Sequence, residues 1–236
     1  MNTPILQARN ISLTYKSSTR SLMGGFVHRA LKDISFDLHQ GETIGILGRN
    51  GGGKSSLLRI LAGIVNPSSG QVICPPKTTR ALLTLGLGFM PGISGRENAM
   101  YSAMLQGMTR KQAKAILNDV DDFAELGEFF DQPIDTYSSG MRARLGFATA
   151  LYTKVDILFI DETLSVGDAH FKKKAETAMK EKLRDTQTCV FVSHNSDQIN
   201  AICTSAIWIE DGVIKEQGKT QTVAHQYNLS MLAQKN

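Results

Sequence analysis

The chain has little that would place it in a membrane or outside the cell. Its only cysteines, Cys74, Cys189 and Cys203, are an odd set without metal-ligand spacing, and Cys189 lies in an apolar run. That pattern predicts a buried reduced thiol and a cytosolic compartment. No apolar run approaches the ~20 residues needed to span a bilayer, and residues 1–4 lack the order of a signal peptide. The net charge of +4 is mild and scattered, which suits a surface near anionic lipid and does not favour a nucleic-acid partner.

What the chain does contain is a phosphate-binding pattern. Residues 48–55 fit G-x-x-x-x-G-K-[ST] at every fixed position, after a predicted strand at 43–47 and before a predicted helix at 56–61. This order places a phosphate at a helix N-terminus, where free N–H groups and the helix dipole favour an anion. Lys54 would reach the β- and γ-phosphates, and the Ser55 hydroxyl would hold Mg²⁺. The predicted nucleotide contacts in this stretch are Gly48, Arg49, Asn50, Gly51, Gly52, Gly53, Lys54, Ser55 and Ser56.

Two further predicted strands end in polar residues. The predicted buried strand that begins at residue 156 ends in Asp161 and Glu162, and the C-terminal end of a parallel strand is where α/β folds place ligands. Asp161 suits Mg²⁺ coordination, and Glu162 could orient or deprotonate a water. The run 190–192 leads to His194, which is either a contact to the γ-phosphate or a structural or surface residue.

Four other stretches have two interpretations each. Residues 138–140 lie at a predicted helix N-terminus and form either a second anion site or an ordinary N-cap. Tyr15 could stack on adenine or be an ordinary half-exposed tyrosine. Residues 16–29 form a loop or a short amphipathic element that touches a membrane or a membrane protein. The glycine-rich apolar residues 85–95 form a hinge or docking surface, or a buried connection. A capping box at residues 109–112 predicts a helix that continues to about residue 126.

Taken in order, these motifs resemble the ATP-binding subunit of an ABC transporter. The resemblance assigns residues 48–55 to the Walker A loop, 157–161 to the Walker B strand and Glu162 to the catalytic glutamate. It places residues 137–141 at the L-S-G-G-Q signature and residues 165–168 at the D-loop. His194 matches the switch histidine, and Tyr15 matches the adenine-stacking aromatic. The chain departs from the family where Ser139 and Met141 replace a glycine and a glutamine of the signature. Met90 stands near the expected Q-loop glutamine.

Three runs also resemble one branch, the bacterial exporters of lipid-linked polysaccharide such as O-antigen, capsule and teichoic acid. They are residues 137–141, the run Gly-Arg-Glu-Asn at 95–98, and Val-Gly-Asp-Ala at 166–169. The extra segment before Arg29 resembles the longer O-antigen and teichoic-acid members. Since the sequence ends at Asn236, we expect no C-terminal carbohydrate-binding domain of the kind that some O-antigen members carry.

The resemblance implies an α/β fold, with a P-loop NTPase core, an N-terminal antiparallel β subdomain and an inserted helical subdomain. We expect residues 1–90 and 155–236 to form the nucleotide-binding core and residues 91–154 the helical subdomain. It also implies ATP hydrolysis with Mg²⁺, with Lys54, Glu162 and His194 as the catalytic residues. Two copies would meet head to tail, each ATP lying between one P-loop and the other copy's Ser138, Ser139, Gly140 and Asp168.

The implied partners are that second copy and an integral membrane permease, which would carry a lipid-linked polysaccharide. The chain would then lie on the cytoplasmic face of the bacterial inner membrane, with no nucleic-acid partner. Two alternatives stay open. An ABC importer ATPase shares all the catalytic residues, and only the branch-specific runs argue against it. A soluble ABC ATPase acting on DNA or ribosomes would need a long coiled coil or tandem cassettes, and the sequence contains neither.

Overall fold

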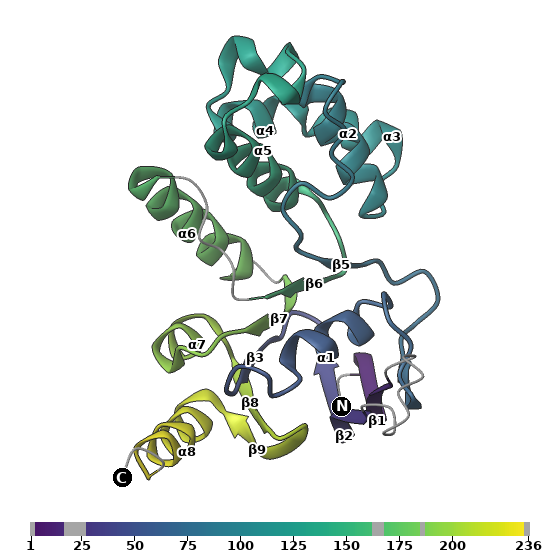
Figure 1. Ribbon diagram of the computed structural model, residues 1–236, viewed down its shortest axis with the longest axis vertical. Coiled ribbons are helices and arrows are strands. Elements are labelled where there is room, and N and C mark those ends of the chain that lie inside the picture. The colour runs from purple at the N-terminus through teal and green to yellow at the C-terminus, as the bar shows by residue number, and fades with distance from the viewer. Residues whose placement is uncertain (1–2, 17–26, 162–167, 185–186, 234–236) are drawn as a thin grey trace, which may run out of the picture. The chain divides into compact units, whose positions relative to one another are not determined.

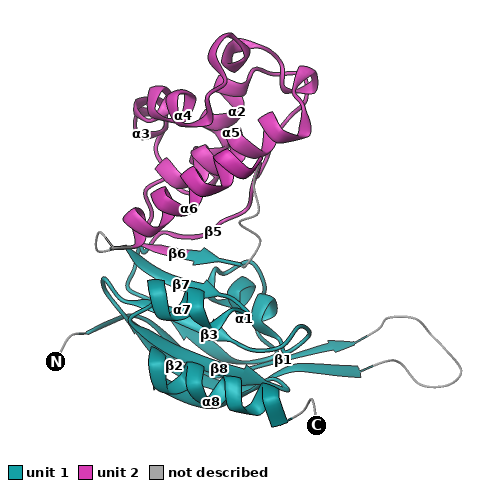
Figure 2. Cartoon of the chain, turned by 90° about the vertical axis from the view of Figure 1, so that its left-hand side faces the viewer, with its two compact units in different colours: residues 1–78, 159–162, 186–236 teal, residues 79–158, 163–185 magenta. Residues whose placement is uncertain are grey.

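The computed structural model describes residues 3–16, 27–161, 168–184 and 187–233. Contacts divide the chain into two compact units (Figure 2). Unit 1 holds residues 1–78, 159–162 and 186–236, and unit 2 holds residues 79–158 and 163–185. No helix within the described ranges is long and apolar enough to cross a membrane.

The antiparallel β subdomain predicted near the N-terminus is a three-stranded sheet in unit 1 (Figure 1). Strand β1 (Pro4–Lys16) lies between β2 (Val27–His39) and β4 (Ser69–Ile73), and it pairs antiparallel with both. In its first half β1 buries alternate residues, because successive side chains of a strand point to opposite faces. Its pairing with β2 is irregular, with several register shifts.

The second sheet of unit 1 is built around β3 (Thr43–Leu47). Strand β3 runs parallel to β7 (Thr188–Val192) on one side and to β8 (Ser205–Glu210) on the other. Strand β9 (Val213–Lys219) then pairs antiparallel with β8. Every residue of β3 and β7 is buried, as is usual for parallel strands covered on both faces. Strand β6 (Ile157–Ile160), also fully buried, contributes its last two residues to unit 1.

Three helices belong to unit 1: α1 (Lys54–Leu61), α7 (Ser196–Ile202) and α8 (Thr220–Ala233). Helix α7 approaches β3 so closely that a Cβ on Gly45 would lie 2.6 Å from Ile199 Cγ2. Only glycine therefore permits this packing. Helix α8 packs on β8 through an edge-to-face contact of Trp208 and Tyr227, whose ring centroids lie 6.0 Å apart.

Unit 2 is mainly helical and includes residues 91–154, the expected helical subdomain, whose bounds stay a prediction. Its elements are β5 (Arg80–Leu82), α2 (Gly95–Leu105), α3 (Arg110–Ala115), α4 (Leu117–Ala124), the 3-10 turns η1 (Gly127–Asp131) and η2 (Ile134–Thr136), α5 (Ser139–Tyr152) and α6 (Ala169–Arg184). Its apolar core includes fully buried Ala99, Val120, Phe130 and Leu145. This buried cluster joins α2, α4, η1 and α5.

The predicted helix from residue 109 to 126 is correct at its start and wrong in its length. Thr109 and Gln112 form the predicted capping box at the start of α3. The helix then breaks at Ile116, which ends α3 and precedes α4. Ile116 and Leu117, at the break, both lie in the core of unit 2.

Candidate functional site

The loop between β3 and α1 contains glycines that approach neighbouring backbone too closely for a Cβ, and glycines that have a left-handed conformation. Gly53 is left-handed, with φ of 93°, and a Cβ there would lie 2.4 Å from the Ala30 carbonyl oxygen. A Cβ on Gly48 would lie 2.2 Å from the Ile209 carbonyl oxygen. Gly51 also has a positive φ, 81°, but no atom lies within 4 Å of its missing Cβ. The two ends of the loop are therefore packed against neighbouring backbone, while the side of Gly51 faces open space.

Lys54 is the first residue of α1 and is only 7% exposed. Its Nζ donates hydrogen bonds to the carbonyl oxygens of Gly48 (2.7 Å) and Arg49 (2.8 Å). The side chain thus folds back over the loop that precedes it. Burial lowers the pKa of Lys54 below its usual value, and the carboxylate of Asp161 opposes that shift.

A cavity of about 440 Å³ opens beside this loop in unit 1. Its lining residues come from β1, β2, the P-loop, α1 and the end of β6: Tyr15, His28, Ala30, Asn50, Gly51, Gly53, Lys54, Ser55, Ser56 and Asp161. The structure therefore brings most of the predicted nucleotide-contacting residues of unit 1 to one cavity. Gly48, Arg49 and Gly52 shape the loop without lining that cavity.

Tyr15 lies at the edge of this cavity and is 42% exposed. Its hydroxyl shares a hydrogen bond of 3.1 Å with the Ser56 hydroxyl. This contact connects β1 to the first turn of α1 and orients the ring at the cavity. An exposed ring face next to a phosphate-binding loop is suited to stacking on a nucleobase. Adenine stacking by Tyr15 stays a prediction.

Ser55 and Asp161 both line the same cavity. A hydroxyl and a carboxylate are the hard oxygen ligands that Mg²⁺ uses in nucleotide sites, together with phosphate oxygens and water. The described residues contain no group of three or more His, Cys, Asp or Glu that could hold a metal by itself. Ser55 and Asp161 are a donor set that suits Mg²⁺ held together with nucleotide phosphates, and this Mg²⁺ site stays a prediction.

His28 and Ala30 were not predicted as site residues. The sequence suggested a loop or an amphipathic element for residues 16–29, whereas β2 begins at Val27. His28 is the direct partner of Tyr15 across the β1–β2 pair, and directly opposite residues project from the same face. The pairing with Tyr15 would have indicated that His28 belongs to the site. The sequence does not reveal this pairing, because residues 16–29 lack the alternation of polar and apolar residues that predicts a strand. Residues 17–26 of this segment lie outside the described chain.

His194, the residue predicted after the end of β7, lies in a tight turn. Ser193 is buried, its hydroxyl donates to Gln198 Oε1 (2.9 Å), and it accepts from the Asn195 N–H (3.0 Å). His194, which lies between Ser193 and Asn195, is exposed and is not among the residues that line the cavity. Glu162, the predicted catalytic glutamate, lies outside the described residues. The proposed roles of His194 and Glu162 therefore stay predictions.

The predicted signature residues lie in unit 2, at the start of α5. Ser138 caps this helix by accepting a hydrogen bond of 3.1 Å from the Met141 N–H. Ser138 and Ser139 are exposed, so this helix N-terminus is open to an anion. Asp168 has a comparable place at the start of α6, where its carboxylate accepts from the Phe171 N–H at 2.9 Å. That hydrogen bond lowers the pKa of Asp168.

Comparison with known proteins identifies the family. A family profile described as ABC transporter matches residues 31–165, more than half of the chain. Two solved structures share its fold. A dimeric ATP-binding cassette in a post-hydrolysis state, bound to ADP and Pi, has a TM-score of 0.72 and 21% identity over 91% of this chain and 98% of its own. An ATP-binding subunit of an ABC transporter has a TM-score of 0.74 and 19% identity, covering 95% and 94%.

The chain belongs to the ABC transporter family, and the predicted resemblance and fold class are confirmed. Within the family it is similar to ATP-binding proteins of polymer export systems. The O-antigen export protein RfbB of Klebsiella pneumoniae is 40% identical over 210 residues, which are 89% of this chain and 85% of RfbB. The teichoic acids export protein TagH of Listeria monocytogenes serotype 4b (strain F2365) is 42% identical, and RfbB of Myxococcus xanthus is 44% identical. Each matches 84% of this chain, which spans 59% of that TagH and 45% of that RfbB.

The buried ammonium of Lys54 predicts that nucleotide binding depends on pH. A phosphate beside Lys54 favours the charged form and raises the pKa that burial had lowered. Binding of ATP should therefore take up protons and should weaken as the pH rises through the lowered pKa, below the usual lysine value of 10.5. Titration calorimetry across alkaline pH, in buffers of different ionisation enthalpy, measures both effects. Lys54→Arg keeps its charge at these pH values. If the affinity of this variant for ATP falls with rising pH as much as that of the wild type, the pH dependence belongs to another group.

Proposed function

We propose that this chain is the ATP-hydrolysing subunit of an ABC transporter that exports a lipid-linked polysaccharide across the bacterial inner membrane. The observation that carries the ATPase part is the cavity of unit 1 that gathers Lys54, Ser55 and Asp161 beside the glycine loop. Membership of the ABC transporter family supports the transport part. The names of similar chains, which are ATP-binding proteins for teichoic-acid and O-antigen export, support the cargo class.

The site residues divide the work of phosphoryl transfer to water. The loop N–H groups and the Lys54 ammonium hold the phosphates and stabilise the charge that develops during transfer. Ser55 and Asp161 would hold Mg²⁺, which supplies further neutralisation of phosphate charge when bound. Glu162 would orient or deprotonate the attacking water, and His194 would contact the γ-phosphate. Tyr15 would stack on the adenine ring.

A second copy of the chain would complete each site. One chain carries one phosphate-binding loop in unit 1 and one open helix N-terminus, capped by Ser138, in unit 2. Two copies related by a two-fold axis would place Ser138, Ser139 and Gly140 of each against the ATP held by the other. Asp168, exposed at the start of α6, would lie at the same junction. ATP binding would then close the pair, and hydrolysis would release it.

A membrane permease would bind the cargo, and the closing and opening of the two copies would change its conformation. The loop of residues 85–93 has the apolar exposure that such a contact requires, since Met90 is 47% exposed and Leu87 is also exposed. The loop lies against α2, because a Cβ on Gly88 would be 2.4 Å from Leu105 Cδ1, and Leu105 is 64% exposed. This apolar patch of unit 2, formed by Leu87, Met90 and Leu105, is the proposed contact with a cytoplasmic helix of the permease. The chain would thus be peripheral on the cytoplasmic face of the inner membrane.

Replacing Met90 by aspartate should uncouple transport from the chain's own chemistry. A charge in the apolar patch must be desolvated when the permease helix packs on it, whereas Met90 lies outside the nucleotide cavity. We expect Met90→Asp to reduce export at least tenfold and to leave ATP affinity of the isolated chain unchanged. Leu232→Asp, at a residue on α8 that is 62% exposed, is the matched control. Normal export by Met90→Asp, with no crosslink from a cysteine at position 90 to the permease, would refute this docking site.

Deleting the gene should separate synthesis of the polymer from its export. Lipid-linked polysaccharide should accumulate at the cytoplasmic face while surface polymer disappears, which blotting of internal and surface fractions detects. Wild-type chain should restore the surface polymer. Lys54→Ala should not, because loss of the ammonium should slow hydrolysis by about 10²–10³-fold. Lys215→Ala, at an exposed lysine on β9, should restore it fully.

The same experiment decides between the exporter and its alternatives. Normal surface polymer in the deletion strain, together with failed uptake of a small nutrient, would favour an importer ATPase. Normal polymer and normal uptake, together with a defect in DNA repair or translation, would favour a soluble ABC ATPase.

A further inference from the structure

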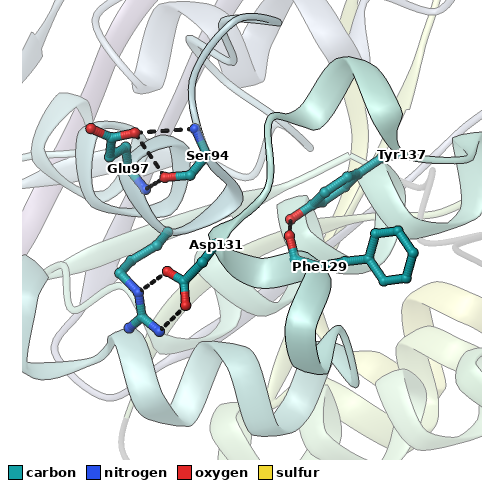
Figure 3. A network of polar contacts seen from close by, with 6 residues as sticks. Ser94, Glu97, Phe129, Asp131 and Tyr137 are labelled. Carbon is teal, nitrogen blue, oxygen red and sulfur yellow. Dashed lines mark hydrogen bonds and ion pairs between the residues drawn. The ribbon is translucent and has the colours of Figure 1, made fainter.

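The run Gly95-Arg96-Glu97-Asn98, which the sequence singled out without assigning it a task, begins helix α2. In the structure it lies between the apolar patch and the segment that leads into the signature residues, all within unit 2. Figure 3 shows the polar contacts around it. Glu97 serves α2 itself, because its carboxylate completes a capping box with Ser94. The other three residues make contacts that reach beyond their own helix.

The backbone next to this run is already bonded to the segment before the signature. Three hydrogen bonds join residues 91–95 to residues 132–135 in a short irregular ladder. They are Gly95 N–H to Gln132 O (3.1 Å), Ile134 N–H to Ile93 O (3.1 Å) and Asp135 N–H to Pro91 O (3.2 Å). The loop that carries Met90 and the turns that precede Ser138 are therefore parts of one hydrogen-bonded structure.

Asn98 fixes the loop from inside. Its side chain is 1% exposed, and its Oδ1 accepts a hydrogen bond from the Met90 N–H at 2.7 Å. Its Nδ2 donates to the carbonyl oxygens of Met90 (3.1 Å), Ile93 (3.1 Å) and Ser94 (3.0 Å). A buried amide that contacts both polar groups of the Met90 backbone determines where this residue lies.

Arg96 reaches from α2 to the turn η1. Its Nε and a terminal nitrogen donate to the two carboxylate oxygens of Asp131, at 2.6 and 3.1 Å. The guanidinium also lies 4.6 Å from the centre of the Phe130 ring. The hydrogen bond from Arg96 lowers the pKa of Asp131, so the pair stays charged at neutral pH. A bidentate pair fixes orientation as well as distance.

Gly95 permits the last contact. A Cβ at this position would lie 2.1 Å from the Tyr137 hydroxyl, which donates a hydrogen bond of 2.6 Å to the Phe129 carbonyl oxygen. Burial, with smaller contributions from Asp121 and Asp131, raises the pKa of Tyr137 to about 12, so the hydroxyl keeps its proton. Tyr137 directly precedes Ser138, the N-cap of α5.

We propose that Asn98 and the Arg96–Asp131 pair are positioning residues that make the Met90 loop and the signature N-terminus move as one element. Gly95, Arg96, Asn98, Asp131 and Tyr137 form this element, which we call the clamp. Displacement of Met90 by a permease helix then reaches Ser138 directly, and ATP contact at Ser138 reaches Met90 in return, since coupling between two sites is reciprocal. This inference rests on the proposed two-copy site.

The test uses the full-length Glu162→Gln chain, which should bind ATP without hydrolysing it, and hydrogen exchange measured with and without Mg-ATP. In this parent, ATP should slow exchange both at residues 138–144 and at residues 90–95. In Arg96→Ala, the ATP effect at 138–144 should remain and that at 90–95 should fall by at least half. The same result is expected for Asn98→Ala. Exchange without ATP separates the two cases, because a merely structural weakening of the clamp would speed exchange at residues 90–95 in both states, whereas lost coupling removes only the difference caused by ATP.

The matched control is Glu97→Ala, one residue from Arg96, which removes the capping box and leaves the clamp contacts in place. It should respond to ATP at both segments as the parent does. The double variant Arg96→Asp with Asp131→Arg should restore the response by reversing the ion pair. If Arg96→Ala fails to fold, Arg96→Lys takes its place, because it keeps the charge and loses the bidentate geometry.

Two outcomes overturn different parts of the argument. A full ATP response at residues 90–95 in Arg96→Ala and Asn98→Ala would refute the clamp while leaving the two-copy site intact. No ATP effect at residues 138–144 in the parent would contradict the two-copy site and, with it, the inference.

Discussion

The close packing of the phosphate-binding loop against neighbouring backbone is the constraint on which the candidate site depends. Gly48 and Gly53 lie where any side chain would meet a carbonyl oxygen, of Ile209 and of Ala30. These contacts fix both ends of the loop, so its N–H groups and Lys54 face one cavity together with Asp161. The hydrogen bonds of Lys54 to the first two loop carbonyls hold its ammonium there in advance of any phosphate. Preorganisation of this kind is what gives a charged group its effect in catalysis.

Unit 2 presents two surfaces through one connected structure. Its apolar patch and its signature helix both depend on the start of α2, where Asn98 holds the Met90 loop and Arg96 holds the turn before Tyr137. The contacts combine backbone hydrogen bonds, a buried amide and a bidentate ion pair. The Asn98 amide and the Arg96–Asp131 pair involve no signature residue, whereas Tyr137, the remaining side chain of the clamp, occupies the first signature position.

Local patterns were enough to predict part of this architecture. The apolar run at residues 43–47, the N-cap at Ser138 and the capping box at Thr109 are each determined by neighbours in sequence, and the structure has all three. His28 was missed because its place in the cavity comes from pairing with Tyr15 across a strand. The clamp was missed for the same reason, since Arg96 and Asp131 are 35 residues apart in sequence. Non-local pairing leaves no periodic signal in either partner.

The measurement that tests the central claim most directly is an ATP-dependent disulfide between two copies of the chain. One copy would carry Asn50→Cys, at an exposed residue of the cavity, and the other Ser139→Cys, at the exposed start of α5. Both would also carry Glu162→Gln, which should prevent hydrolysis. Both would carry Cys74→Ser as well, because Cys74 is the native cysteine that is partly exposed, whereas Cys189 and Cys203 are buried. The account predicts that oxidation yields a heterodimer when Mg-ATP is present and none when it is absent. No crosslink with ATP bound to both copies, or equal crosslinking without ATP, would contradict a site shared between one copy's loop and the other's signature helix.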